Sequence, residues 1–97
     1  MDKSSVLKLL NEQFETTRQR FGIKNIGVFG SAARNELRDD SDVDVLVEFE
    51  GLPTFDGYMD LKFFLESLFA RRVDLVTRDS IKPRMRKIIE KDLIRVP

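Results

Sequence analysis

Two aspartates two positions apart are the clearest candidates for chemistry in this sequence. Asp42 and Asp44 lie at the start of an alternating segment, Val43 to Phe49, whose odd-numbered positions are apolar. Residues i and i+2 of a strand point to the same side, with α-carbons about 7 Å apart, so the carboxylates would share one face. Such a pair favours a shared proton or a divalent cation, and oxygen-only ligands favour Mg²⁺ or Mn²⁺. A solvated acidic strand end remains the structural alternative.

A third aspartate, Asp74, interrupts a second apolar segment, Val73 to Thr77. If this strand neighbours the strand of the aspartate pair, three carboxylates converge, which is the ligand set that a two-metal phosphoryl-transfer site requires. A lone charge is poorly placed on a core face, so we expect Asp74 to have a partner. A salt bridge to Arg71, Arg72 or Arg78 is the alternative to a metal.

A glycine and a serine precede these acids and could hold a phosphate. Gly30 allows close backbone approach, Ser31 offers a hydroxyl, and the helix start expected after them points free N–H groups at an anion, although many ordinary turns contain Gly-Ser. Arg34, one turn later, could reach a phosphate or could pair with Asp39 or Asp40. The glycines do not form a dinucleotide fingerprint, and none precedes Lys-Ser or Lys-Thr, so the Rossmann and P-loop classes are excluded.

The composition narrows the chemistry further. The 97 residues include no cysteine and no histidine, which excludes disulfide frameworks, Ser-His-Asp triads and imidazole metal ligands. Carboxylates must therefore carry any catalysis. Seventeen basic and seventeen acidic residues give no net charge, which argues against a general nucleic-acid binder. No apolar run predicts a transmembrane helix and the first residues do not form a signal peptide, so we expect a cytoplasmic protein without membrane contact.

The charges are distributed unevenly along the chain. Residues 39–50 contain six acids and no base, whereas residues 71–95 contain nine bases and four acids. The basic segment Lys82 to Arg95 could form a partner surface or a solvated helix face. The aromatic stretch Leu52 to Tyr58 could form a second partner surface or a helix entry packed into the core.

The apolar spacing predicts the elements that position these residues, within a single domain over residues 1–97. Each strand is predicted from a short run of branched and aromatic residues, and each helix from a 3.6-residue period. The predicted strands are Asn25 to Phe29, Val43 to Phe49 and Val73 to Thr77. The first predicted helix is capped by Ser4 or Ser5 and ends near Phe21-Gly22, where Gly suits a left-handed cap. The second covers Ala32 to Leu37 with Ser31 near its N-cap, and the third covers Tyr58 to Ala70. The last begins near Pro83 and carries Met85, Ile88, Ile89 and Leu93 on one face.

The order Gly30-Ser31-Ala32-Ala33-Arg34, then Ser41-Asp42-Val43-Asp44, with Asp74 about thirty residues on, resembles the DNA polymerase beta-like nucleotidyltransferase superfamily. The chain is similar over nearly its whole length to the stand-alone minimal nucleotidyltransferases (MNT), antitoxins encoded beside HEPN-domain toxins and described as transferring AMP from ATP onto the toxin. The resemblance implies an α/β (α+β) fold with a small mixed β-sheet flanked by helices. Many relatives have Gly where this chain has Asn35, a residue that tolerates left-handed backbone angles.

The resemblance also implies a role for each residue of the motif. Gly30 and Ser31 would grip the triphosphate of ATP. Asp42 and Asp44 would bind the Mg²⁺ or Mn²⁺ that escorts the nucleotide. Asp74 would complete the second metal site and help to activate the acceptor hydroxyl.

These features together favour metal-dependent nucleotidyl transfer, in which an acceptor hydroxyl attacks the α-phosphate of ATP and pyrophosphate leaves. The resemblance implies that the acceptor is a partner HEPN toxin. One alternative is a non-catalytic antitoxin that masks its partner. Transfer to a small molecule is disfavoured, because acceptor recognition there usually comes from an added helical domain. The sequence leaves open the nucleotide base and the formation of a homo-oligomer.

Overall fold

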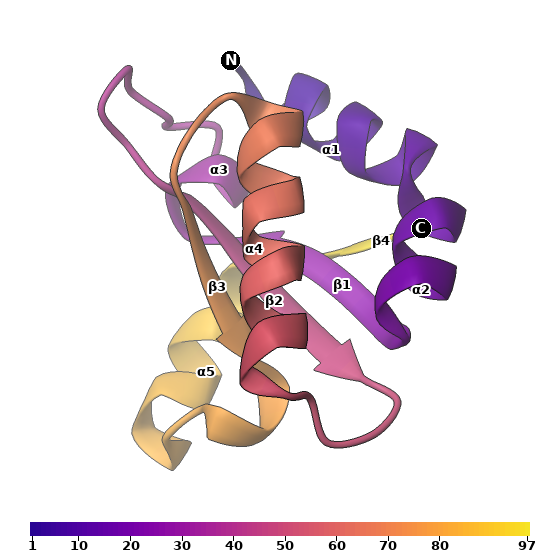
Figure 1. Ribbon diagram of the computed structural model, residues 1–97. Helices are drawn as coiled ribbons and strands as arrows, with labels where there is room; N and C mark the ends of the chain where they lie inside the picture. The colour runs from indigo at the N-terminus through magenta and orange to yellow at the C-terminus, as the bar shows by residue number, and fades with distance from the viewer.

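The strands form one mixed sheet in a computed structural model that describes all residues 1–97 (Figure 1). The strand order is β3-β2-β1-β4; β1 is antiparallel to both of its neighbours, and β2 is parallel to β3. Parallel neighbours need a crossover connection, which α4 supplies between β2 and β3. The elements are α1 (Lys3–Glu12), α2 (Phe14–Phe21), β1 (Ile23–Phe29), α3 (Gly30–Ala33), β2 (Val43–Phe49), α4 (Phe55–Phe69), β3 (Val73–Thr77), the 3₁₀ turn η1 (Arg78–Ser80), α5 (Pro83–Asp92) and β4 (Ile94–Val96). The expected mixed sheet flanked by helices is confirmed.

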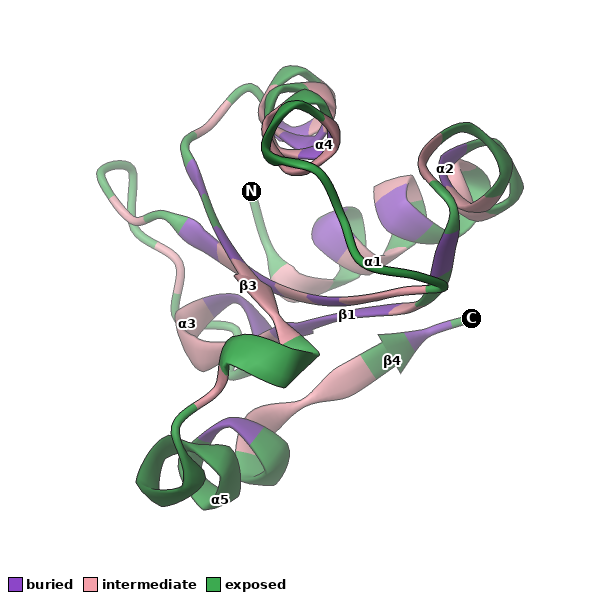
Figure 2. Cartoon of the chain, turned by 60° about the horizontal axis from the view of Figure 1, so that its bottom comes forward, coloured by how far each residue is buried: buried purple, intermediate pink, exposed green.

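The core lies on one face of this sheet. Val43, Val45 and Val47 are fully buried, which confirms the alternation predicted for β2. Figure 2 shows α1, α2 and α4 on this side of the sheet and α5 on the other. Burying one such side chain contributes roughly 1.5–3 kcal/mol, so the apolar period of β2 fixes which face turns inward. The polar positions of β2, including Asp44, therefore face the side of α5.

The N-terminal segment forms two helices where one was predicted. The cap is Asp2, whose Oδ1 accepts a hydrogen bond from the Ser5 backbone N at 2.8 Å; either serine was expected in that role. Gln13 leaves helical geometry at φ −101° and ψ 6°, and its carbonyl accepts from the Thr17 hydroxyl at 2.6 Å. The break lets α1 and α2 bury separate faces. Gly22 ends α2 at φ 64°, as predicted for a left-handed cap.

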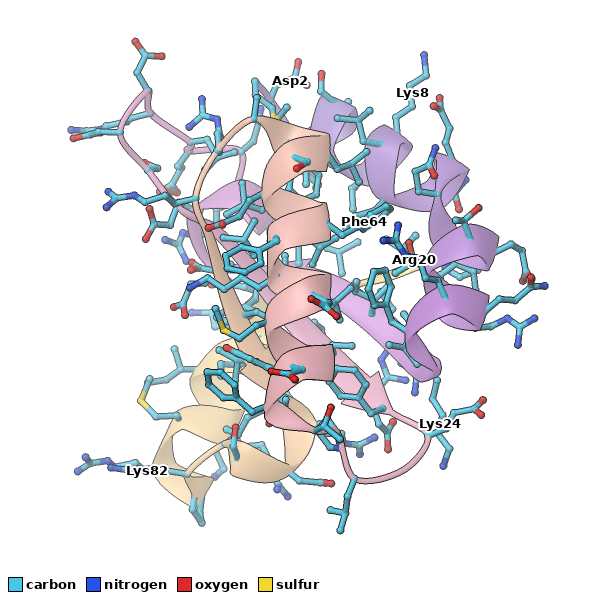
Figure 3. The ribbon with its side chains drawn as sticks, in the orientation of Figure 1. Asp2, Lys8, Arg20, Lys24, Phe64 and Lys82 are labelled. Carbon is cyan, nitrogen blue, oxygen red and sulfur yellow. The ribbon has the colours of Figure 1, made fainter.

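A cation–π contact joins α2 to α4 outside the core. The Arg20 guanidinium lies 5.5 Å from the centroid of the Phe64 ring and 5.0 Å from that of Phe21. Figure 3 labels Arg20 and Phe64, which face each other between the two helices. Such a contact at an exposed site contributes about 0.5–1 kcal/mol, so it supports the helix pair without determining it.

The short helix after β1 begins and ends earlier than predicted. It spans Gly30–Ala33, where Ala32 to Leu37 was expected. Asn35 adopts φ 60°, which confirms its predicted tolerance of left-handed angles, and its Oδ1 accepts from the Lys3 backbone N at 2.8 Å. A left-handed residue cannot continue a right-handed helix, so α3 ends before it.

The C-terminal region contains one element that the apolar period missed. Helix α5 begins at Pro83 as predicted, but β4 follows it and pairs with β1 over Ile26 to Val28. Three residues are too few to show a period. The predicted apolar face of α5 is also wrong in part, because Met85 and Ile88 are 42% and 59% exposed and only Ile89 is buried. No helix of the structure has both the length and the apolar composition needed to cross a membrane.

Candidate functional site

Two of the predicted carboxylates stand side by side on the sheet. Asp44 of β2 is the register partner of Asp74 in β3, and Phe29, the last residue of β1, is its partner on the other side. Neighbouring strands lie about 4.8 Å apart and register partners share a face, so both carboxylates project from the side opposite the valine core. The predicted neighbourhood of the two strands is therefore present.

Asp74 projects away from the core face, where a lone charge would be poorly placed. It is exposed, while its neighbours Val73 and Leu75 are buried on the opposite face. The reason is strand alternation, which turns Asp74 outward. It forms none of the salt bridges proposed as its alternative role. The three arginines have other partners: Arg71 donates to the carbonyls of Arg38 and Ser41, Arg72 pairs with Asp42, and Arg78 pairs with Glu48.

Gly30 brings backbone directly against the Asp44 carboxylate. Its φ of +65° is in the left-handed region, and a β-carbon built on it would lie 2.1 Å from Asp44 Oδ2. Both facts require glycine at this position. The turn thus places the start of α3, with Ser31 as its second residue, next to the carboxylate pair.

Arg34 follows α3 and has carboxylate partners other than those expected. Its Nη1 lies 2.6 Å from Asp92 Oδ2, and its Nε lies 3.3 Å from Glu36 Oε1. Neither Asp39 nor Asp40, the predicted alternatives, forms this pair. The Asp92 contact joins α3 to the end of α5 and was not predicted, because no local pattern relates residues 58 positions apart.

The electrostatics of Asp44 reflect an excess of negative charge. Its pKa is raised to about 6, first by burial and then by the neighbouring Asp74 and Asp42 carboxylates, in that order of importance, while Arg34 opposes the rise. The ionised form is thus disfavoured by desolvation and by like charge. A cation bound at these oxygens would remove the second cause.

Asp42 completes the acidic group but turns to an arginine. Its Oδ1 lies 3.3 Å from Arg72 Nε, and the side chains are 46% and 80% exposed. In this arrangement the acids do not form a closed cluster of three metal-ligating side chains. An exposed ion pair is worth only about 0–1 kcal/mol, which is a small cost for turning Asp42 toward a cation. The donor set, carboxylate oxygens only, has the chemistry that Mg²⁺ and Mn²⁺ prefer.

The carboxylates stand at an open surface. A cavity of about 50 Å³ lies between the sheet and α5. Its walls include Gly27 and Leu46 from the sheet and Ile89 from α5, with Arg78 and Arg86 also lining it. None of the predicted site residues lines this cavity. Asp42 lines a different, more open hollow of about 190 Å³, together with Arg71 and Arg72.

The aromatic stretch Leu52 to Tyr58, which includes the first turn of α4, is largely exposed. Leu52 is 97% and Phe55 77% exposed, so this end of the segment is not packed into the core. Tyr58 is half-buried, and its hydroxyl donates to the carbonyl of Leu75, the residue after Asp74. Burial and the Asp74 charge raise the pKa of Tyr58, so this phenol remains neutral and serves as a donor.

The basic segment presents one continuous charged stripe on α5. Arg84, Lys87 and Lys91 are exposed, are spaced along one helix face, and take part in no ion pair. Arg86 is also exposed, and it lines the cavity together with Glu90. It lies on a different face of α5 from the stripe.

Comparison with known proteins agrees with this geometry. Residues 10–96 match the sequence profile of the nucleotidyltransferase domain family. The protein adenylyltransferase MntA of Thermococcus cleftensis is 41% identical over 88 residues, which are 91% of this chain and 89% of that protein. A solved structure named as a candidate minimal nucleotidyltransferase is 38% identical and superposes with a TM-score of 0.81, covering 97% of this chain and 95% of that one.

A more distant structure shares the fold alone. It is a chain of the complex between the tri-AMPylated HEPN toxin and the MNT antitoxin of Shewanella oneidensis. The TM-score is 0.67 at 18% identity, and the match covers 92% of this chain and 70% of that one.

Proposed function

The chain belongs to the nucleotidyltransferase domain family, and from this premise we propose that it is a metal-dependent enzyme that transfers AMP from ATP to a hydroxyl of a partner protein. One observation carries the proposal: the Gly30 turn lies against Asp44, and Asp74 stands opposite Asp44 on the next strand. A phosphate cradle and a carboxylate pair thus meet at one edge of the sheet.

The nucleotide would bind at the turn between β1 and α3. Gly30 has no side chain to block the approach of a phosphate, and Ser31 contributes a hydroxyl and a backbone N–H at the start of α3. Arg34, at the end of the same short helix, supplies positive charge close enough to lower the pKa of Asp44. The three residues come from one segment, so a single turn would hold the triphosphate.

The carboxylates would hold the divalent cation that accompanies the nucleotide. Asp44 and Asp74 would hold it from adjacent strands, and Asp42 would join them after leaving Arg72. When bound, Mg²⁺ or Mn²⁺ neutralises charge on the triphosphate and on the departing pyrophosphate. The repulsion that raises the pKa of Asp44 would be relieved in the same event.

In the transfer step, the acceptor oxygen forms a bond to the α-phosphorus while the bond from that phosphorus to the pyrophosphate oxygen breaks. Asp74 is the acid best placed to receive the proton of the acceptor hydroxyl, because it is exposed and stands beside Asp44. No covalent enzyme intermediate is required. The products are the AMP-modified acceptor and pyrophosphate.

The acceptor class is inferred from the relatives. The Thermococcus cleftensis protein is named a protein adenylyltransferase, and the Shewanella oneidensis complex pairs an MNT antitoxin with an AMPylated HEPN toxin. We therefore expect the partner to be a HEPN-domain protein and the modified group to be one of its side-chain hydroxyls. The exposed stripe on α5 would offer it a surface.

Label transfer from α-labelled ATP to a HEPN-domain protein encoded beside this chain tests the proposal. The variant with Asp42→Asn and Asp44→Asn should lose both transfer and metal-dependent ATP binding in calorimetry. The matched control carries Asp39→Asn and Asp40→Asn, which remove two exposed acids from the preceding loop. Equal ATP binding by the first variant and the parent would show that the nucleotide site lies elsewhere.

A masking antitoxin without catalysis is the second candidate. The observation that favours it is the pairing of Asp42 with Arg72, which leaves the three acids short of a closed metal cluster. If the Asp42→Asn and Asp44→Asn variant still suppresses the partner's activity as well as the parent does, masking is the function. Efficient transfer to a free small molecule without a protein partner would overturn the protein-acceptor assignment.

A further inference from the structure

We propose that Asp92, the last residue of α5, is a positioning residue that orders the Arg34 guanidinium for binding the triphosphate of the nucleotide. The inference rests on the proposed function and adds to it a residue that contacts neither nucleotide nor metal. Helix α3 follows directly from β1 and is in contact with α5.

The contact between the two residues is short, and Asp92 is the less exposed of the two carboxylates that Arg34 contacts. Arg34 Nη1 donates to Asp92 Oδ2 at 2.6 Å. The Asp92 side chain is 16% exposed, whereas that of Glu36, the second partner of Arg34, is 60% exposed. A charge-assisted bond that is partly withdrawn from water is stronger than an exposed one, so Asp92 is the partner that determines where the guanidinium lies.

The position of Asp92 is unfavourable unless it is paired. The C-terminal end of a helix carries partial negative charge, which favours Lys, Arg or His there and disfavours a carboxylate. Partial burial adds a desolvation cost. The positive charge of Arg34 offsets both the helix-end repulsion and the desolvation cost of Asp92. The electrostatic cost at the end of α5 is thus balanced by a contact with the candidate nucleotide site.

The pair leaves part of the guanidinium free. An arginine has five N–H donors in a rigid fork. Asp92 accepts from Nη1 and Glu36 accepts from Nε, while Nη2 donates to no group of the chain. Arg34 also acts electrostatically on Asp44 across the site. The ordered guanidinium therefore keeps donors for a phosphate beside the carboxylates.

An arginine that is already ordered loses less side-chain entropy when it binds a ligand. Removal of the Asp92 charge should therefore weaken triphosphate binding without changing the reacting groups. For Asp92→Asn in the full chain, we expect the Kd and KM for ATP to rise about tenfold, with kcat changed less than about twofold. Binding of adenosine, which has no phosphate, should not change.

A double-mutant cycle tests whether Asp92 acts through Arg34. Calorimetry would compare the ATP affinity of the parent, Asp92→Asn, Arg34→Gln and the double variant, all with Mg²⁺. If Asp92 works by ordering Arg34, Asp92→Asn has no further effect in the Arg34→Gln background. Glu36→Gln is the matched control and should change the affinity little, because Glu36 is mostly exposed. Asp92→Glu, which keeps the charge, should restore most of the affinity.

Three results would overturn the inference. The first is tighter ATP binding by Asp92→Asn than by the parent. The second is that Asp92→Asn weakens adenosine binding as much as ATP binding. The third is that Asp92→Asn weakens ATP binding in the Arg34→Gln background as much as it does in the parent. If Asp92→Asn does not fold, Asp92→Glu and Arg34→Lys provide the same comparison, once thermal denaturation has shown that these variants are folded. Absence of ATP binding by the parent chain is a different result, because it removes the proposed function itself.

Discussion

Asp44 and Asp74 lie directly opposite each other in the parallel pair of β2 and β3. Burial of Asp44 and the charges of its neighbours Asp74 and Asp42 together disfavour its ionised form and raise its pKa to about 6. The cost of ionising Asp44 is expected if the site binds the positive charge of a metal–nucleotide complex. It also makes the stability of the metal-free chain depend on pH.

In EDTA, we expect the free energy of unfolding to fall as pH rises from about 4 to 7, through the contribution of Asp44. Its pKa is about 6 in the folded chain and 3.8 ordinarily, so the folded state binds this proton more tightly. The stabilisation is complete below pH 3.8, is lost as pH approaches 6, and is absent above it. Urea denaturation of the parent and of Asp44→Asn across this range measures the difference.

The difference in the free energy of unfolding between the parent and Asp44→Asn isolates the contribution of Asp44, because all other acids titrate in both proteins. Asp39→Asn, in the exposed loop before β2, serves as the matched control. Adding Mg²⁺ above pH 6 should stabilise the parent but not Asp44→Asn. A parent-minus-variant difference that is flat with pH would show that the folded chain does not raise the pKa of Asp44.

Gly30→Ala should destabilise the chain and disrupt the nucleotide site. A left-handed φ costs a residue with a β-carbon about 1–2 kcal/mol, and the new atom would displace the Asp44 carboxylate. Because the Asp44 carboxylate would no longer be correctly placed, we expect the affinity for ATP to fall at least about tenfold. Gly51→Ala is the control, because a β-carbon there meets nothing within 4 Å. Unchanged ATP binding in a folded Gly30→Ala protein would exclude this turn from the site.

Asp74→Asn should separate binding from catalysis. If Asp74 receives the acceptor proton, its loss lowers kcat by about 10²–10⁴-fold, the usual range for general acid–base catalysis. ATP binding should change much less, since Asp44 and the Gly30 turn remain. Single-turnover transfer and calorimetry on the same sample provide both quantities. Undiminished transfer would remove Asp74 from the mechanism.

Charge reversal on α5 should weaken capture of the acceptor protein. Arg84→Glu with Lys87→Glu changes two exposed, unpaired residues of the stripe. If the partner surface is acidic, association should weaken about tenfold and lose part of its salt dependence, while ATP binding stays unchanged. Lys8→Glu with Lys24→Glu makes a comparable charge change elsewhere on the surface. Equal weakening by both variants would indicate a general charge effect and no docking surface on α5.

Two helix ends provide a stability prediction independent of function. Ala70 ends α4 at φ 53° and Gly22 ends α2 at φ 64°, both in the left-handed region. Ala70→Gly relieves the strain at the cost of a more flexible unfolded chain, for a net gain of about 0.5 kcal/mol. Gly22→Ala should cost about 1 kcal/mol, because its β-carbon meets no atom and only the backbone term applies. Thermal denaturation measures both, and the same sign for the two would contradict this account.

The elements that could be predicted are those with a local signature. The alternation of Val43 to Phe49 predicts β2 with the right bounds, because the buried face repeats every second residue. Pro83 and the glycine at 22 mark helix ends through backbone geometry alone. The resemblance carried by Gly30-Ser31 and the Asp42–Asp44 pair implied one shared site, and in the structure the Gly30 turn lies against Asp44.

The rest depends on contacts between distant segments. β4 is too short to show a period and exists because its backbone pairs with β1. The same holds for Asp92, whose position at the end of α5 carries no signal until the fold brings it to Arg34. Asp74 was rightly expected on a strand beside that of Asp44, but its exposure and the absence of the proposed salt bridges to Arg71, Arg72 or Arg78 follow from the fold. The sequence by itself thus indicated which residues form the candidate site and determined the strands that carry Asp44 and Asp74. Tertiary structure alone decided their electrostatic partners, since burial and charge pairing depend on distances in space.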